Sequence, residues 1–170
     1  IEELKKHPDR IETKICVTSQ HRQMLDQVLD LFGIKPDFNL DIMQENQNLQ
    51  TVTALIIQRL KQVIDELKPD WLLVQGDTTT TFVSSLSGFY SGIKVAHVEA
   101  GLRTWNKKEP FPEEINRVLT SHIADVHFAP TAAAKDNLVS EGIKPDSIWV
   151  TGNTVVDALQ MILNRINEKA

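Results

Sequence analysis

The sequence predicts an α/β fold in which a mainly parallel β-sheet is doubly wound, with helices on both of its faces. Short runs of β-branched and apolar residues alternate with longer segments whose apolar residues recur every three to four positions. This alternation of strands and helices is typical of βαβ units, which build parallel sheets. The chain has 170 residues, of which 41% are hydrophobic, and can therefore bury a sizeable core. We expect a single domain over residues 1–170.

The first strand and the two helices after it are predicted from their periodicity. An alternating, β-branched run forms the strand, whereas both helices carry their apolar residues on one stripe. Gly33 and Pro69 end the two helices, because glycine tolerates the left-handed cap and proline disfavours helix in the residue before it. The expected bounds are 11–18 for the strand, 22–32 and 49–67 for the helices, and 34–47 for a segment that is mostly loop.

The second part of the chain continues the same alternation. Residues 71–75 form a continuous apolar run, which is typical of a strand buried on both faces. The helix that follows, at 79–91, has no charged residue, and its second face consists of Ser, Thr and Gly. We expect that face to pack against another domain or subunit, and we infer a homodimer through this helix. The remaining expected elements are strands at 94–99, 126–129 and 148–150, a polar loop at 100–111, and helices at 112–124, 131–142 and 154–168.

Charge and composition exclude several classes of partner. The net charge of −5 argues against nucleic acid and acidic membrane surfaces, because both reward basic patches. No apolar run approaches the roughly 20 residues that a membrane span needs. Cys16 is the only cysteine, so there is no disulfide framework, and we expect a cytoplasmic protein. The sequence has neither a metal-binding His/Cys spacing nor the glycine-rich dinucleotide motif, so we expect no metal and no cofactor.

Three carboxylates mark the candidate active site. Asp77 follows the strand at 71–75, and Glu99 ends the strand at 94–99. The carboxyl ends of parallel strands meet at one edge of the sheet, where ligands bind in open α/β folds. Glu113 opens the next helix and brings a third carboxylate to that edge. Such a group would push its members' pKa values apart, which suits acid–base chemistry.

Each of these carboxylates also has a purely structural interpretation. Asp77, or its neighbour Thr78, could cap the following helix. Glu99 could close its loop through an ion pair with Arg103. Glu113 lies four residues before Arg117, which is a routine helical pair. The functional interpretation is favoured because all three carboxylates converge on one edge.

Five short motifs are spread over nearly the whole chain. They are QHR at 20–22, GDTTT at 76–80, HVEAGLRT at 97–104, PEExNR at 112–117 and TGNT at 151–154. Together they resemble the bacterial, non-hydrolysing UDP-N-acetylglucosamine (UDP-GlcNAc) 2-epimerases. The resemblance implies the Rossmann-like half of a two-domain fold of the glycosyltransferase-B type, with the substrate in the cleft between the domains and dimerisation through the N-terminal domain.

The resemblance also implies a reaction. An isomerase of this family interconverts UDP-GlcNAc and UDP-N-acetylmannosamine (UDP-ManNAc), a precursor of surface polysaccharide. The C2 proton is removed, UDP leaves to give a glycal-like intermediate, and both are then added back. Asp77, Glu99 and Glu113 match the family's catalytic carboxylates, although which is acid and which is base stays open. Arg103 and Arg117 are candidates for substrate binding and charge balance.

The family also binds a second UDP-GlcNAc as an activator. Gln20, His21 and Gln23 match positions that bind it, and Gln47 is a further candidate. His21, at a strand-to-helix turn, is the histidine best placed to contact a ligand. The chain departs from the family at two positions: Asn46 stands where the resemblance implies arginine, and Trp105 stands where it implies glycine.

Compared with the family, the chain lacks the first strand and the C-terminal domain. We therefore expect an N-terminal domain that is truncated at both ends. Half of the substrate cleft is missing, so we expect little or no activity from the 170-residue chain alone. Two alternatives stay open: a hydrolysing epimerase, which would release ManNAc and UDP, and a non-catalytic module for nucleotide-sugar binding or oligomerisation.

Overall fold

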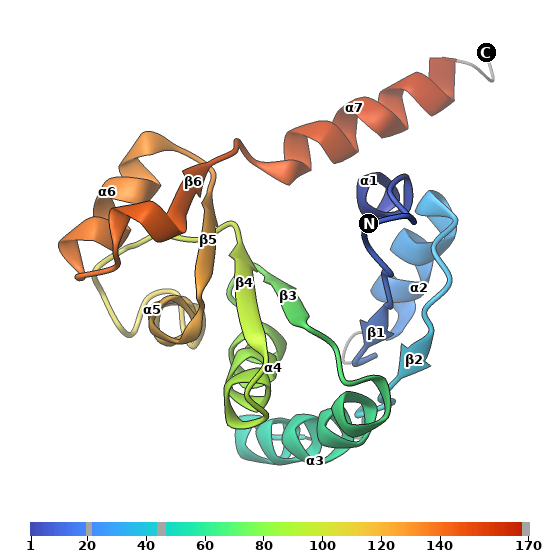
Figure 1. Ribbon diagram of the computed structural model, residues 1–170, viewed down its shortest axis with the longest axis horizontal. Coiled ribbons are helices and arrows are strands. Elements are labelled where there is room, and N and C mark those ends of the chain that lie inside the picture. The colour runs from blue at the N-terminus through green and yellow to red at the C-terminus, as the bar shows by residue number, and fades with distance from the viewer. Residues whose placement is uncertain (20–21, 44–46, 168–170) are drawn as a thin grey trace. The chain divides into compact units, whose positions relative to one another are not determined.

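Two parallel β-sheets organise the chain, one in each of two compact units, Ile1–Glu66 and Leu67–Ala170 (Figure 1). The computed structural model describes residues 1–19, 22–43 and 47–167. All strand pairs in both sheets are parallel, and helices connect them along the chain. The predicted α/β class with a parallel sheet is therefore confirmed. We describe the two units separately, and the single domain over residues 1–170 stays a prediction.

The first unit is built on a two-stranded sheet, in which β1 (Cys16–Val17) pairs with β2 (Phe38–Asn39). The predicted strand at 11–18 is thus much shorter than expected. The predicted loop contains a strand, because backbone N–H groups after Pro36 bond to carbonyl groups of the first strand segment. Two residues are too few to show a period of two, so this strand was not predicted. The helices that begin in this unit are α1 (Glu2–Lys5), α2 (Arg22–Phe32) and α3 (Leu49–Leu67).

The second unit contains a four-stranded sheet whose strands lie side by side in chain order (Figure 1). Their bounds are Trp71–Gln75 for β3, Lys94–Val98 for β4, Val126–Ala129 for β5 and Ile148–Val150 for β6. The helices are α4 (Thr79–Tyr90), α5 (Glu113–Ile123), α6 (Ala132–Ser140) and α7 (Thr154–Asn167), with a short 3₁₀ helix at Pro145–Ser147. Strands and helices of this unit agree with the predicted bounds to within two residues.

Within the second unit, a helix covers one face of strand β3, and the predicted burial of both faces stays a prediction. Leu72 lies beside Gly88 of α4, on the side of the sheet that the helix covers. Trp71 and Leu73 alternate with it and are 46% and 49% exposed. Sequential parallel strands joined by right-handed crossovers place their connecting helices on one face. A continuous apolar run shows that a strand suits burial, but not that both of its faces have a partner.

The uncharged helix α4 is buried within the chain. It packs against β3, β4 and α5, and its small residues allow the close approach. At Gly88, a Cβ would come within 3.0 Å of the Leu72 side chain and 3.2 Å of Val95. The Ser, Thr and Gly face therefore has an explanation inside the chain and does not by itself require a second subunit. Phe89 and Tyr90, at the end of the helix, remain exposed.

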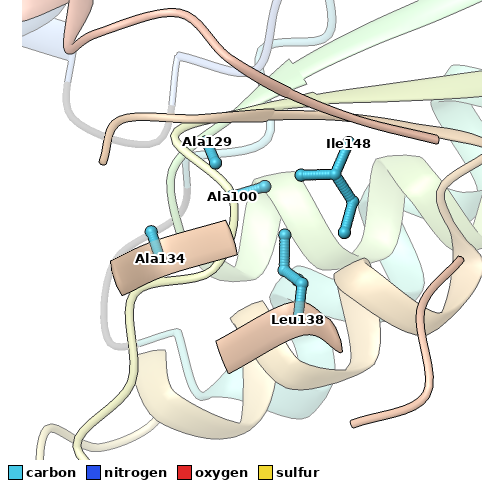
Figure 2. Close-up of a cluster of buried hydrophobic side chains, with 5 residues drawn as sticks. All are labelled: Ala100, Ala129, Ala134, Leu138 and Ile148. Carbon is cyan, nitrogen blue, oxygen red and sulfur yellow. The ribbon is translucent and has the colours of Figure 1, made fainter. Parts of the chain in front are cut away.

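Beside the sheet, α6 closes a small hydrophobic core. Figure 2 shows Leu138 of α6 pointing toward Ile148 and Ala100, and Ala129 and Ala134 complete this buried cluster. The loop after β4 runs directly over α6.

No helix among the residues that the structure describes is both long enough and apolar enough to cross a membrane.

Candidate active site

The carboxyl ends of β3 and β4 and the first turn of α5 carry the three predicted carboxylates. Asp77 follows β3 by two residues, Glu99 follows β4 directly, and Glu113 is the first residue of α5. The cap of α4 is Thr78, whose hydroxyl accepts a hydrogen bond from the Thr81 N–H at 3.2 Å. The Asp77 carboxylate is therefore not used as a helix cap.

Helix α5 holds Asp77 at two points. Nη1 of Arg117 lies 3.3 Å from Oδ2 of Asp77, and the guanidinium group is almost fully buried. Nδ2 of Asn116 donates a hydrogen bond to the backbone carbonyl of Asp77 at 3.0 Å. Both the side chain and the backbone of Asp77 are thus fixed relative to the helix that begins at Glu113.

The partner of Arg117 within α5 is Glu114, and not Glu113 as the sequence suggested. Nε of Arg117 donates to Glu114 at 2.7 Å, and Nη2 contacts the same carboxylate oxygen. Glu114 also accepts the N–H groups of Thr104, at 3.1 Å, and Trp105, at 2.9 Å. Burial alone would raise the pKa of Glu114, but these hydrogen bonds outweigh it and hold the pKa below its ordinary value.

Glu99 has a strained backbone, with a φ of +67°. Non-glycine residues rarely adopt this conformation, and such outliers cluster at functional sites. Oε1 of Glu99 accepts a hydrogen bond from Nδ2 of Asn153, at 3.1 Å, just before α7. Oε2 lies 3.7 Å from the position that a Cβ on Gly76 would take. The Glu99 carboxylate therefore lies beside the turn that carries Asp77.

Arg103 does not pair with Glu99 and lies in a different network. Its fully buried side chain donates through Nε and Nη2 to Glu141, at 2.8 and 2.7 Å. Nη2 also donates to the Ser121 hydroxyl, and Nη1 to the Leu102 carbonyl. The structure therefore brings Arg117, and not Arg103, to the carboxylates, and Arg103 balances the charge of Glu141. A role of Arg103 in binding substrate stays a prediction.

The surroundings of Asp77 change its ionisation. Burial raises the pKa of Asp77, and repulsion by Glu113 and Glu99 adds to the rise, whereas Arg117 opposes it. The net effect is a raised pKa, so Asp77 keeps its proton to a higher pH than an exposed aspartate. The mutual influence expected of converging carboxylates is present at this residue.

His97 forms a hydrogen bond to the turn that precedes Asp77. The ring is fully buried, and Nε2 lies 2.8 Å from the carbonyl oxygen of Gly76. A carbonyl only accepts, so Nε2 carries the proton, and Nδ1 has no partner among the described residues. Burial lowers the pKa of His97 to about 4, so the ring is neutral at pH 7. A neutral ring with this one hydrogen bond fixes the turn without adding charge to the site.

Four residues of the site had no role assigned from the sequence: His97, Glu114, Asn116 and Asn153. A signal for two of them was present. Asn153 follows the carboxyl end of β6 and so belongs to the same sheet edge as Asp77. Asn116 lies one helical turn after Glu113 and shares its face. No sequence feature distinguished Glu114 from Glu113.

The predicted activator residues belong to the first unit. Gln20 and His21 lie outside the described residues, as does the side chain of Gln23, whose backbone is part of α2. Gln47 donates a hydrogen bond to the Ile42 carbonyl. The activator site therefore stays a prediction. Within the described part of the chain, no group of three or more His, Cys, Asp or Glu side chains is arranged to hold a metal ion.

Comparison with known proteins identifies the family. The sequence model of the UDP-N-acetylglucosamine 2-epimerase family matches residues 2–170. The chain is 61% identical over 157 residues to UDP-N-acetylglucosamine 2-epimerase of Bacillus subtilis (strain 168), covering 92% of this chain and 41% of the relative. It is 56% identical over 164 residues to the protein of the same name from Neisseria meningitidis, covering 96% of this chain and 44% of the relative.

Solved structures agree with the sequence comparison. The crystal structure of UDP-GlcNAc 2-epimerase from Neisseria meningitidis bound to UDP-GlcNAc matches with a TM-score of 0.92 and 55% identity, over 98% of this chain and 45% of that one. This match confirms the predicted Rossmann-like half of a glycosyltransferase-B type fold. The chain spans less than half the length of these relatives. It belongs to the UDP-N-acetylglucosamine 2-epimerase family.

Proposed function

We propose that this chain forms part of an isomerase that interconverts UDP-GlcNAc and UDP-ManNAc. The observation that carries the proposal is the convergence of Asp77, Glu99 and Glu113 on one edge of a parallel sheet, with Arg117 beside Asp77. Membership of the epimerase family supports it. So does the relative at 55% identity whose crystal structure contains UDP-GlcNAc.

Epimerisation at C2 requires proton removal on one face of the sugar ring and proton return on the other. A carboxylate takes the C2 proton, the C1–O bond breaks, and UDP leaves with the bonding electron pair. The product is a glycal with a double bond between C1 and C2. UDP then bonds again to C1, and a carboxyl group returns a proton to C2 from the opposite face. Asp77, Glu99 and Glu113 come from three different elements and so suit groups on different sides of a ring. Asp77, with its raised pKa, is suited to one of these two proton transfers.

Hydrogen–deuterium exchange tests the proposal. The protein as its gene encodes it is incubated with UDP-GlcNAc in heavy water, and we expect deuterium at C2 together with UDP-ManNAc. Asp77→Asn should abolish exchange, whereas Asp146→Asn, the same change at an exposed position, should not. Absence of both exchange and UDP-ManNAc in the unsubstituted protein would refute the proposal.

The same experiment separates the two alternatives. Release of ManNAc and UDP would indicate a hydrolysing epimerase. Binding of UDP-GlcNAc without exchange would indicate a non-catalytic module.

We further propose a cytoplasmic location. We also propose little or no turnover by the 170-residue chain alone, because the relatives are more than twice as long. Turnover by the isolated chain at the rate of the full gene product would contradict the second point.

A homodimer through α4 is also proposed. The helix carries no charge, and it ends in Phe89 and Tyr90, which are 62% and 70% exposed with ring centroids 6.2 Å apart. Replacing both with serine should convert the dimer into a monomer in sedimentation experiments at micromolar concentration. Val139→Ser, at an exposed apolar position of α6, is the matched control and should leave the dimer intact. A monomeric unsubstituted protein would count against the dimer.

A further inference from the structure

Arg117 is shared unequally between two carboxylates. Two of its nitrogens, Nε and Nη2, bind Glu114, with the Nε contact at 2.7 Å. Only Nη1 reaches Asp77, at 3.3 Å, which is beyond the usual length of a charge-assisted hydrogen bond. The geometry therefore assigns Arg117 first to Glu114 and only second to Asp77.

Charge counting in this buried group gives the same result. Arg117 is largely buried and needs a counter-charge, and Glu114, which is 3% exposed, supplies one. The pair is then neutral, and an ionised Asp77 would add a negative charge without a counter-ion of its own. Anchoring the loop does not explain the charge of Glu114, since a neutral oxygen could also accept the N–H groups of Thr104 and Trp105.

We propose that Glu114 is a positioning residue that takes up the charge of Arg117 and so leaves Asp77 able to bind and release a proton during the reaction. This inference rests on the proposed epimerase function. It concerns a residue outside the three carboxylates assigned to proton transfer, and Glu114 acts on Asp77 only through Arg117.

The surroundings of Asp77 are consistent with this arrangement. From β4 it is faced by Glu99 and, through the Gly76 carbonyl, by the neutral ring of His97. From α5 it is faced by Glu113 and by Arg117, which Glu114 holds, while α4 carries no charged residue. The pKa of Asp77 is raised, mainly by burial, although a guanidinium group contacts it. An arginine without a second partner would be expected to lower it.

Titration of Asp77 tests the inference directly. The carboxyl ¹³C signal of Asp77, assigned by its loss in Asp77→Asn, is followed against pH in the 170-residue chain. In Glu114→Gln, Arg117 has only Asp77 as counter-ion, so the midpoint should move to lower pH by about one unit. Glu114→Asp moves the carboxylate away from Arg117 by the length of one methylene group and should give a smaller shift in the same direction. This variant provides the test if Glu114→Gln does not fold.

The matched control removes the counter-charge of the other buried arginine. Glu141→Gln changes the partner of Arg103, which makes no contact with Asp77 among the described residues, and should leave the Asp77 midpoint unchanged. Circular dichroism checks that each variant is folded. An Asp77 midpoint in Glu114→Gln that is unchanged or higher would overturn the inference.

The pH dependence of C2 exchange provides a second measurement, in the protein as its gene encodes it. Whichever limb of the profile Asp77 governs should move to lower pH in Glu114→Gln. A merely structural role for Glu114 would lower exchange at every pH without moving the limb, and this result would overturn the inference. If the unsubstituted protein shows no exchange at all, the proposed function fails, whereas the titration of Asp77 still decides the role of Glu114.

Discussion

Gly101 lies where the structure leaves no room for a side chain, two residues after Glu99. Its φ is +93°, in the left-handed region. A Cβ at this position would lie 2.2 Å from the carbonyl oxygen of Ala134 and 3.0 Å from the side chain of Leu138, both in α6. The carbonyl belongs to the helix backbone and cannot rotate away. Gly101→Ala must therefore move the loop or the helix.

Two costs add in this variant. A left-handed backbone costs a residue with a Cβ about 1–2 kcal/mol. Forcing extra volume into a packed core costs about 1–3 kcal/mol. We therefore expect Gly101→Ala to lower the free energy of unfolding by about 2–5 kcal/mol.

Gly142→Ala is the matched control, because Gly142 has a φ of +89° and no neighbouring atom within 4 Å of a built Cβ. It should show the backbone cost alone, about 1–2 kcal/mol. Urea unfolding followed by far-ultraviolet circular dichroism measures both variants. Equal unfolding midpoints for the two would refute the reasoning, since the contact between the loop and α6 would then cost nothing.

Three further predictions concern stability. Trp105 has a φ of +62° and is exposed. Trp105→Gly should therefore raise the free energy of unfolding by up to about 1 kcal/mol, whereas Trp105→Ala, which keeps a Cβ, should not. Thermal melts compare the two variants. Burial lowers the pKa of His97 to about 4, so the unfolded chain binds a proton there that the folded chain does not. Stability should fall from about pH 6.5 to pH 4, and urea midpoints should fall less steeply in His97→Gln. Burial raises the pKa of Glu114, but its hydrogen bonds outweigh burial and lower the pKa overall. The contribution of Glu114 to folding stability is therefore present above its unfolded pKa and is lost as pH falls through its folded pKa. In Glu114→Gln, stability should depend less steeply on pH in that range.

The strands and α-helices of the second unit, none of them shorter than three residues, could be predicted from their apolar runs and periodicity. The two-residue strand β2 could not, because its pairing depends on backbone hydrogen bonds to a segment more than twenty residues away. The face of β3 that α4 covers could not be predicted either. Trp71 and Leu73 are as apolar as Leu72, so the sequence contains no sign of which of them a helix covers.

The position of the site followed from a general property of parallel sheets, but its internal pairing did not. The strand-end rule placed Asp77 and Glu99 at one edge. On a helix, residues three and four apart both lie beside Arg117, so Glu113 and Glu114 are equivalent candidates. The choice depends on the loop after β4, which brings two N–H groups to Glu114 and so buries it. That contact comes from outside the helix, so the sequence of the helix does not indicate it.

The loop between β4 and α5 is part of the site and more than a connection. It begins at Glu99 with a left-handed backbone, is held against α6 at Gly101, and returns to α5 where Glu114 binds the N–H groups of Thr104 and Trp105. The contacts that close the core therefore also set the separation of two candidate catalytic carboxylates. In the proposed epimerisation, proton removal and return on opposite faces of the ring would depend on that separation. A substitution in this loop can thus change the rate without touching a carboxylate, and Trp105, in place of the glycine that the family resemblance implies, is where such an effect is expected first.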